Sequence, residues 1–513
     1  MFQNGCGLAQ SDEEAVRWYR KAADQGTSDA QYNLGLMFEK GRGVAQSNEE
    51  AVQWYIKAAD QGNSDAQFNL GVMFSEGRGV APSDKEAIQW FSKAAEQGYA
   101  RAHCKLGFMY ESGRGVAQSD EEAFKWHGKA ADQGLAQAQC TLGFMFAEGR
   151  GVAQSDEEAA LWYRKAADQG HTGAQNNLGI MFAQGRGVAQ SDEEAFKWHG
   201  KAADQGLARA QNCIGVMFAE GRGVAQSDEE AVKWYRKAAD QGDAQAQCIV
   251  GVMFQDGRGV AQSDVEAVKW YRKAAEQGYI AAQFNLGFIF EYGRGVAQSD
   301  LKAVKWYHKA AEQGYAGAQC NLGLMFEDGR GVAQSDLEAV KWYRKAADQG
   351  YAEAQCNLGK MVRQGLGVAQ SYKEAFQLYS KAAHRGLAPA QHNFGVMFEN
   401  GHGIAQSYEE AVKWYSKAAD QGYALGQFSL GSMFSQGLGV AQSDEEAVKW
   451  YRKAANQDLA MAQHNLGYMF ENGRGVAQSI KEAIRWYSKA ADQGDSDAQY
   501  NLGLVLAKSR GMA

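Results

Sequence analysis

Apolar and charged residues alternate along this chain at the spacing of an amphipathic helix. From Ala15 to Ala23 the apolar residues fall at i, i+3, i+4, i+7 and i+8, and charged residues fill most of the positions between them. This is one apolar stripe with a period of about 3.6 residues. Ser11 and Glu14 form a capping box, in which the serine hydroxyl accepts a first-turn amide and the glutamate reaches back. With Gly26 as a left-handed C-cap, the pattern predicts a first helix between Ser11 and Gly26.

A second amphipathic segment follows, from about Asp29 to Glu39. Its expected buried side consists of Ala30, Leu34, Met37 and Phe38. Gly41 is expected to close this helix. In a later copy of the segment Pro389 takes the place of Asp29, which fits the first turn of a helix. A Gly-x-Gly-Val connection then leads to the next serine, and we expect it to make a turn rather than bind phosphate.

The two helices recur with a period of 36 residues and without insertion or deletion. The opening serine returns at Ser11, Ser47, Ser83, Ser119, Ser155, Ser191, Ser227, Ser263, Ser299, Ser335, Ser371, Ser407, Ser443 and Ser479. One such pair buries too little apolar surface to be stable alone, so neighbouring pairs must stack. The chain is therefore predicted to be an all-α array of helix pairs.

Certain positions of the repeat hold small or aromatic residues almost without exception. Gly35 lies inside the second helix and has a counterpart in every copy through Gly503, although glycine there costs about 1 kcal/mol. A close approach of helices would explain it. Trp18 has a tryptophan counterpart in every copy but one, where Leu378 replaces it. We expect this aromatic to fill the joint between repeats.

The string EAVKWYRKAADQGYAEAQCNLG, from Glu338 to Gly359, resembles the Sel1-like repeat family, a relative of tetratricopeptide repeats. The resemblance covers essentially the whole chain. It implies an all-α, right-handed α/α superhelix (solenoid) of fourteen 36-residue helix-turn-helix repeats, with a concave surface that binds proteins or peptides. Residues 1–10 would be a partial repeat, the end of a second helix plus a loop. Residues 11–513 would be the array, with no second domain.

The resemblance implies a non-enzymatic scaffold or adaptor, as in signalling, protein degradation or bacterial contact with host cells. The alternative is a penicillin-binding, β-lactamase-like hydrolase, because one secreted, cysteine-rich branch of the family is associated with penicillins. That branch carries a regular cysteine pair in each repeat, and no repeat here holds two cysteines. The segment Ser299-Asp300-Leu301-Lys302 matches the Ser-x-x-Lys of serine acylases. It is also a capping box with lysine in place of glutamate, which is the interpretation that we favour.

Composition narrows the partners further. A net charge of -8, from 53 basic and 61 acidic residues, favours neither nucleic acid nor an anionic membrane. The sequence shows no membrane span and no signal peptide, so we expect a cytoplasmic location. The seven cysteines and nine histidines form no metal spacing, which predicts free thiols and no metal or cofactor. His127 and His199 occur in near-identical copies, which duplication explains.

The best candidate binding surface is a row of cations in two positions of four consecutive repeats. Its members are Lys233, Arg236, Lys269, Arg272, Lys305, His308, Lys341 and Arg344. Stacking would align them, and an acidic peptide could lie along them. The alternative is a solvated face, in which Glu229 and its equivalents pair with the lysines at i, i+4 for about 0.2–0.5 kcal/mol each. Ile56, in the position of Arg236, is an apolar candidate contact.

The two ends of the chain lack the polar caps that solenoids need. Met1-Phe2 aligns with Met37-Phe38, so the chain begins within a second helix, and it stops at Ala513 just after another. We therefore expect the ends to meet partners or further repeats.

Overall fold

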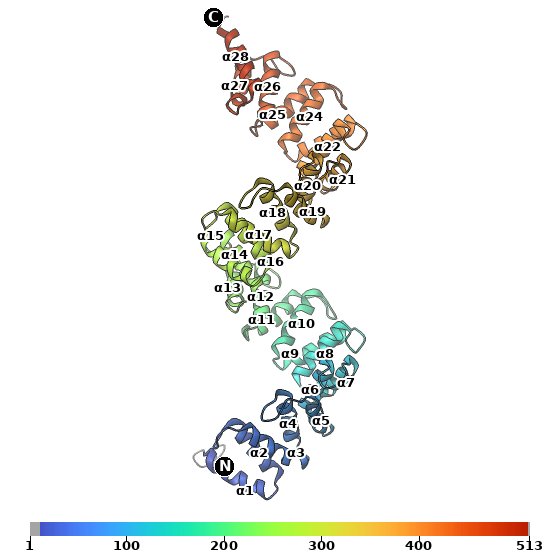
Figure 1. The fold of residues 1–513 in the computed structure, drawn as a ribbon, viewed down its shortest axis with the longest axis vertical. Helices are drawn as coiled ribbons and strands as arrows, with labels where there is room; N and C mark the ends of the chain where they lie inside the picture. The colour runs from blue at the N-terminus through green and yellow to red at the C-terminus, as the bar shows by residue number, and fades with distance from the viewer. Residues whose placement is uncertain (1–10, 511–513) are drawn as a thin grey trace. The chain divides into compact units, whose positions relative to one another are not determined.

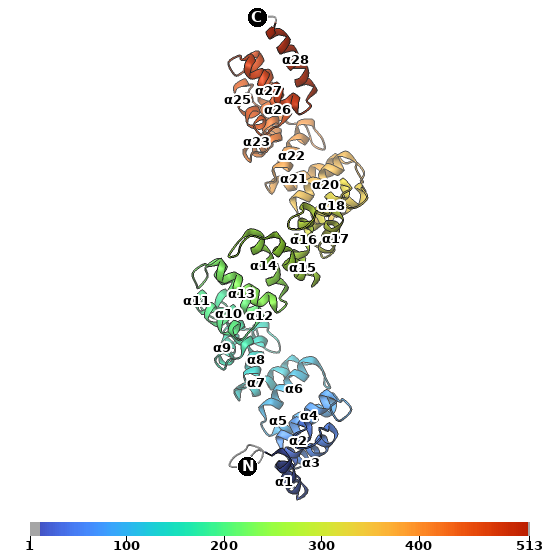
Figure 2. The same cartoon turned by 90° about the vertical axis from the view of Figure 1, so that its left-hand side faces the viewer.

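The structure, a computed structural model, describes the backbone of residues 11–510 and the side chains of residues 11–507. The described residues form helices and no strand, in two compact units, Met1–Ala261 and Gln262–Ala513 (Figures 1 and 2). The helices of the first unit are α1 (Asp12–Asp24), α2 (Ser28–Lys40), α3 (Asn48–Asp60), α4 (Ser64–Glu76), α5 (Asp84–Glu96), α6 (Ala100–Ser112), α7 (Asp120–Asp132), α8 (Ala136–Glu148), α9 (Asp156–Asp168), α10 (Thr172–Gln184), α11 (Asp192–Asp204), α12 (Ala208–Glu220), α13 (Asp228–Asp240) and α14 (Ala244–Asp256). Those of the second are α15 (Asp264–Glu276), α16 (Ile280–Tyr292), α17 (Asp300–Glu312), α18 (Ala316–Asp328), α19 (Asp336–Asp348), α20 (Ala352–Gln364), α21 (Tyr372–His384), α22 (Ala388–Asn400), α23 (Tyr408–Asp420), α24 (Ala424–Gln436), α25 (Asp444–Ala455), α26 (Ala460–Asn472), α27 (Ile480–Asp492) and α28 (Ser496–Arg510).

The odd-numbered helices are the predicted first helices of the repeats, and the even-numbered helices are the second ones. The prediction of an all-α solenoid of helix pairs is confirmed. The expectations for the partial repeat over residues 1–10, for Met1-Phe2 and for Ala513 concern residues that lie outside the described part of the chain.

The start of each first helix is capped as expected, but only in part. The amide of Glu50 donates to the Ser47 hydroxyl at 3.2 Å, and Glu14 does the same with Ser11 at 3.3 Å. The predicted reach of the glutamate back to the serine is wrong. The Ser47 amide already donates to the carbonyl of Phe38 at 3.0 Å, so the glutamate in this position has no donor to accept from there. It pairs forward instead, as Glu14 does with Arg17 at 2.9 Å.

The glycine turns hold the two helices of a repeat together. Gly26 and Gly41 have positive φ angles of 92° and 63° and end the first and second helices, as predicted. Gly43, at φ 68°, lets the connection pass against the backbone of Asp12 at the start of the first helix, where a side chain would not fit. Arg42 binds the carboxylate of Asp12 at 2.8 Å. The Gly-x-Gly loop is therefore a turn that also connects the end of the second helix to the start of the first helix of the same repeat.

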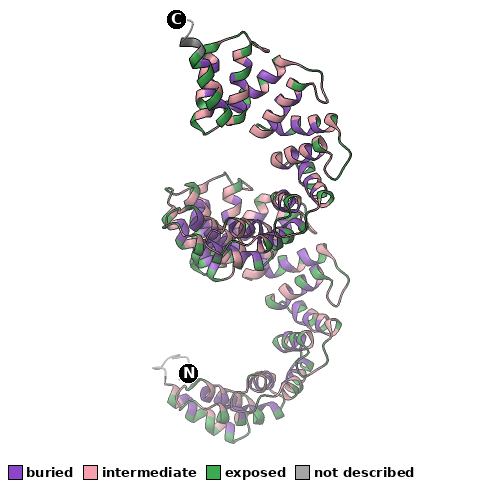
Figure 3. Ribbon diagram, turned by 45° about the horizontal axis from the view of Figure 1, so that its top comes forward, coloured by how far each residue is buried: buried purple, intermediate pink, exposed green. Residues whose placement is uncertain are grey.

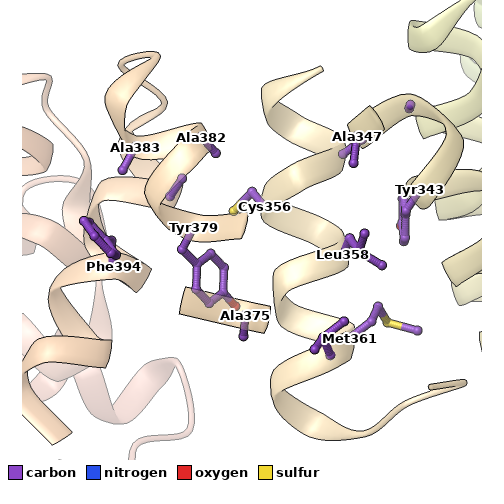
Figure 4. Packing of buried hydrophobic residues seen from close by; sticks show 14 of the residues in the cluster. Tyr343, Ala347, Cys356, Leu358, Met361, Ala375, Tyr379, Ala382, Ala383 and Phe394 are labelled. Carbon is purple, nitrogen blue, oxygen red and sulfur yellow. The ribbon is translucent and has the colours of Figure 1, made fainter. Parts of the chain in front are cut away.

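In most repeats the glycine inside the second helix packs against an aromatic ring of the next first helix. A Cβ atom at Gly359 of α20 would lie 2.9 Å from Cε1 of Tyr379, which comes from α21 and is fully buried. Figure 4 shows the Tyr379 ring beside α20, in a cluster with Leu358 and Met361. The predicted close approach of helices is confirmed, and it joins neighbouring repeats.

The tryptophans of the first helices lie between successive first helices. Trp414 of α23 packs on His384 at the end of α21 and on Phe394 of α22, with ring centroids 5.1 and 5.0 Å away. Burial is concentrated on the sides of the helices that face one another (Figure 3). Trp18 of α1 is 56% exposed, because no first helix precedes α1 in the described residues. The predicted role of this aromatic at the joint is confirmed where a preceding repeat is described.

A ladder of glutamines also connects the repeats, and the sequence analysis missed it. The side-chain amide of Gln61 donates to Gln31 of the preceding repeat at 2.6 Å, and Gln31 donates to the carbonyl of Ala23 at 3.0 Å. Most repeats show the same two bonds. Where Arg385 replaces the first glutamine, the Oε1 atom of Gln355 is buried without a partner. The ladder satisfies polar groups that stacking would otherwise bury unpaired.

Candidate functional site

The candidate cations lie on the solvent side of the first helices in both units. Unit 2 carries Lys269 and Arg272 on α15, Lys305 and His308 on α17, and Lys341 and Arg344 on α19. Lys233 and Arg236 lie on α13 of unit 1, and Ile56 is 36% exposed on α3. All of the lysines and arginines of this set are exposed, and His308 is half-buried.

Successive first helices of unit 2 are neighbours, so the cations on them share one face. The rings of His308 on α17 and Trp342 on α19 are 5.5 Å apart. The guanidinium of Arg344 on α19 pairs with Glu374 of α21 at 3.0 Å. The Gln313 side chain after α17 donates to the carbonyl of Gly278 after α15 at 3.3 Å. Within unit 2 the structure therefore brings the predicted residues of three helices together.

Most of the candidate lysines form ion pairs with glutamates of their own helix, but these glutamates are not the predicted ones. Lys233 binds Glu230 at 2.5 Å, three residues before it, and Glu229 instead accepts a bond from Ser227. Lys269 and Lys341 pair at i, i+3 in the same way, at 2.5 and 3.1 Å. The predicted i, i+4 pairing is wrong. The glutamate that follows Glu229 in the sequence, Glu230, does not reach back to the capping serine, so its carboxylate is free to bind the lysine three residues later.

Two candidate cations in unit 2 form no ion pair with any described residue. They are Arg272 and Lys305. Arg236 in unit 1 lies over the ring of Phe254 at 4.9 Å, and His308 approaches Glu312 at 3.4 Å. Lys305 lacks a partner because Lys302 stands where other repeats have glutamate. Unit 2 thus has one unpaired candidate cation on each of α15 and α17.

Another lysine position of the first helices was missed from the sequence. One turn after each tryptophan, a lysine lies over the indole: Lys237 over Trp234 at 3.6 Å, and Lys453 over Trp450 at 3.8 Å. Cation–π contacts of this kind contribute about 0.5–1 kcal/mol at exposed sites. The signal was the recurrence of Trp-x-x-Lys, and these lysines cover the joint between the repeats.

Among the described residues, three histidines (His103, His127 and His199) and four cysteines (Cys104, Cys248, Cys320 and Cys356) are buried. Burial lowers the pKa of His127 and of His199 to about 4, so both are neutral near pH 7. It raises the pKa of Cys104 to about 11 and that of Cys320 to about 12, which keeps these thiols protonated. The described residues include no group of three or more His, Cys, Asp or Glu side chains that could hold a metal ion.

The Ser-x-x-Lys segment has the geometry of a helix cap. The Ser299 hydroxyl accepts a bond from the amide of Lys302 at 3.4 Å, as the other capping serines do. The ammonium of Lys302 lies over the ring of Phe290, 5.3 Å from its centroid. This arrangement does not direct the lysine at the serine hydroxyl as an acylating serine requires.

The second helices carry shallow hollows between them. One of about 320 Å³ in unit 1 is lined by Phe144, Tyr163, Ile180 and Arg186, among others. Arg186 is held by Asp156 at 2.6 Å, and burial raises the pKa of Tyr163 above its usual value. Over the described residues, no helix is both long and apolar enough to cross a membrane.

Comparison with known proteins places the repeats in a family. The Sel1 repeat model matches nearly the whole chain, in successive segments from 1–27 and 28–63 to 496–512. Each full segment starts at a second helix and ends after the next first helix. These are the two helices that the contact between the glycine and the aromatic ring joins. A comparison with curated proteins gave no match.

Solved structures agree with this assignment. The protective antigen c5321 of uropathogenic Escherichia coli, described as displaying an SLR fold, is 35% identical, with a TM-score of 0.75; the match covers 88% of this chain and 97% of c5321. A Sel1 repeat protein from Oxalobacter formigenes is 36% identical over 61% of this chain and 89% of its own, with a TM-score of 0.50.

Proposed function

Because this chain belongs to the Sel1 repeat family, we propose that it is a non-enzymatic scaffold that binds protein or peptide segments on its first-helix surface. The supporting observation is that exposed cationic positions recur on α15, α17 and α19, which are neighbours in unit 2. Weak contacts with each helix add when one segment touches several of them. The expectation that this surface is the concave one is part of the proposal.

Acidic segments are the partners that the charges favour. Arg272 and Lys305 have no partner among the described residues, so a carboxylate can bind them without displacing an internal one. The lysines that pair with glutamate at i, i+3 are exposed, and such pairs contribute only about 0.2–0.5 kcal/mol. They can exchange partners at little cost.

The proposal of a non-enzymatic role rests on the state of the reactive side chains. The buried histidines are neutral, the buried thiols are protonated, and Ser299 caps a helix. A hydrolase needs a nucleophile, a base and an oxyanion site that converge in one place. The hydrolase alternative has no such observation in its favour.

Selection from a random peptide library on the purified full chain tests the proposal. We expect enrichment of peptides that contain Asp and Glu, and several-fold lower capture by the double variant Arg272→Gln, Lys305→Gln. The matched control is Lys105→Gln, Arg209→Gln, which removes the same charge from second helices. Failure to enrich any peptide, or an equal loss with the control, would contradict the proposal.

A further inference from the structure

An apolar row lies on the same three helices that carry the candidate cations. Val265 of α15, Leu301 of α17 and Leu337 of α19 are 53%, 71% and 67% exposed. They occupy the third position of the repeat, counted from the capping serine, where every other copy has glutamate or lysine. These three residues are called the apolar row below.

The fold does not require apolar residues in this position. α13 has Glu229 there, and it begins and ends at the same repeat positions as α17. Both helices are capped by their serine in the same way. Single exposed apolar residues are common on protein surfaces, but here the same exception occurs in three consecutive repeats, on helices that are neighbours, and grouped apolar exposure is typical of contact sites.

The apolar row adjoins candidate cations on the same three helices. On each helix the third position lies on the same side as the cation four residues later. Leu301 therefore neighbours the unpaired Lys305, and Val265 neighbours Lys269, which pairs with Glu266. Replacing glutamate by an apolar residue also removes one negative charge from each of the three helices. On α17, Lys302 replaces a second glutamate. The row thus lies beside a line of lysines, of which Lys305 forms no ion pair with any described residue.

We propose that the apolar row and the neighbouring cations of unit 2 bind a segment of a partner protein that carries leucine-like side chains flanked by carboxylates. This inference rests on the proposed function and specifies its partner. The apolar side chains of the segment cover the row, and its carboxylates bind Arg272 and Lys305. An anionic membrane fits less well, because Glu276, Glu312 and Asp348 are exposed at the far ends of the same helices and repel lipid phosphates.

Fluorescence anisotropy with synthetic peptides tests the proposal on the full chain. The probe contains leucines at every third or fourth position with glutamates between them. One control peptide replaces the leucines by serine, and another replaces the glutamates by glutamine. Both controls are expected to bind at least about tenfold more weakly than the probe, a difference of about 1.4 kcal/mol.

The variant is Val265→Glu, Leu301→Glu, Leu337→Glu, which installs the residue most common in this position and so preserves the fold. We expect it to bind the probe at least about tenfold more weakly than the wild type. The matched control is Met461→Glu, which removes another exposed apolar residue from α26 and is expected to bind normally. Circular dichroism should show the same helix content for all three proteins.

Equal binding of the serine peptide, or unchanged binding by the triple variant, would overturn the proposal. So would binding to phosphatidylglycerol vesicles that the triple variant loses, since the surface would then recognise lipid. If the triple variant still captures the library peptides, the binding role of the apolar row is refuted and the proposed function stands. Failure of every peptide would refute both.

Discussion

Adding one methyl group at Gly323 should show how tightly neighbouring repeats are joined. In a Gly323→Ala variant the new Cβ would lie 2.6 Å from Cε1 and 2.7 Å from Cδ1 of Tyr343. The ring cannot easily move away. It is fully buried, and its hydroxyl donates to Glu327 at 2.7 Å.

The expected effect is a balance of opposing contributions. Alanine is a better helix former than glycine by about 1 kcal/mol. Overpacking a buried joint costs about 1–3 kcal/mol, and losing a hydrogen bond to a carboxylate costs about 1.5–3 kcal/mol more if the ring turns. The net destabilisation should therefore be on the order of 2 kcal/mol.

Gly503→Ala is the matched control, because it lies in the same position of the repeat and a Cβ there meets nothing within 4 Å. Amide hydrogen exchange is the appropriate assay, since repeat arrays open locally rather than all at once. Exchange of α18 and α19 should become faster in Gly323→Ala, and Gly503→Ala should show no loss of protection. A Gly323→Ala protein as stable as the wild type would refute the close approach.

Three further substitutions test local features, each by its urea unfolding midpoint. Asp458 has a positive φ of 61° where other repeats have glycine, so Asp458→Gly should stabilise the chain by up to about 1 kcal/mol; a lower midpoint would contradict this. His127 has a pKa lowered to about 4 by burial, so the unfolded chain takes up the proton first and stability falls as the pH drops from about 6.5 to about 4. His127→Tyr, which can bond Glu111, should remove up to roughly 3 kcal/mol of that loss, and an unchanged pH profile would refute the assignment. Arg385→Gln should give the buried Oε1 of Gln355 its donor and stabilise by about 1–3 kcal/mol, whereas no gain would mean that the atom is already satisfied.

The periodic features of the sequence predicted the fold well because each is a local signal repeated many times. Ser47, Gly41 and the apolar stripe of Ala30 to Phe38 fixed the helix bounds to within a residue or two. The glycine inside the second helix correctly indicated a close approach, although its ring partner in the next repeat could not be read from spacing alone.

The side-chain partners could not be predicted because they depend on which backbone groups stacking has already used. Glu14 does not reach back to Ser11. In later copies, such as Ser47, the serine amide already donates a hydrogen bond to a carbonyl of the preceding helix. The Gln61–Gln31 bond joins residues 30 apart, which only the stacked arrangement brings together.

The sequence placed the candidate cations on neighbouring helices, but it did not identify their partners. Most of the cations in unit 2 form ion pairs. The sequence spacing assigned the lysines to glutamates four residues earlier, whereas the structure pairs them with glutamates three residues earlier. Leu301 was visible as an exception to a charged position, yet its 71% exposure became evident only from the structure.

Hydrogen exchange of the full chain with and without a library-selected acidic peptide tests the central claim most directly. The account predicts slower exchange in the first helices α15, α17 and α19, with the second helices α16 and α18 little changed. Protection confined to second helices, or none anywhere at a saturating peptide concentration, would contradict it.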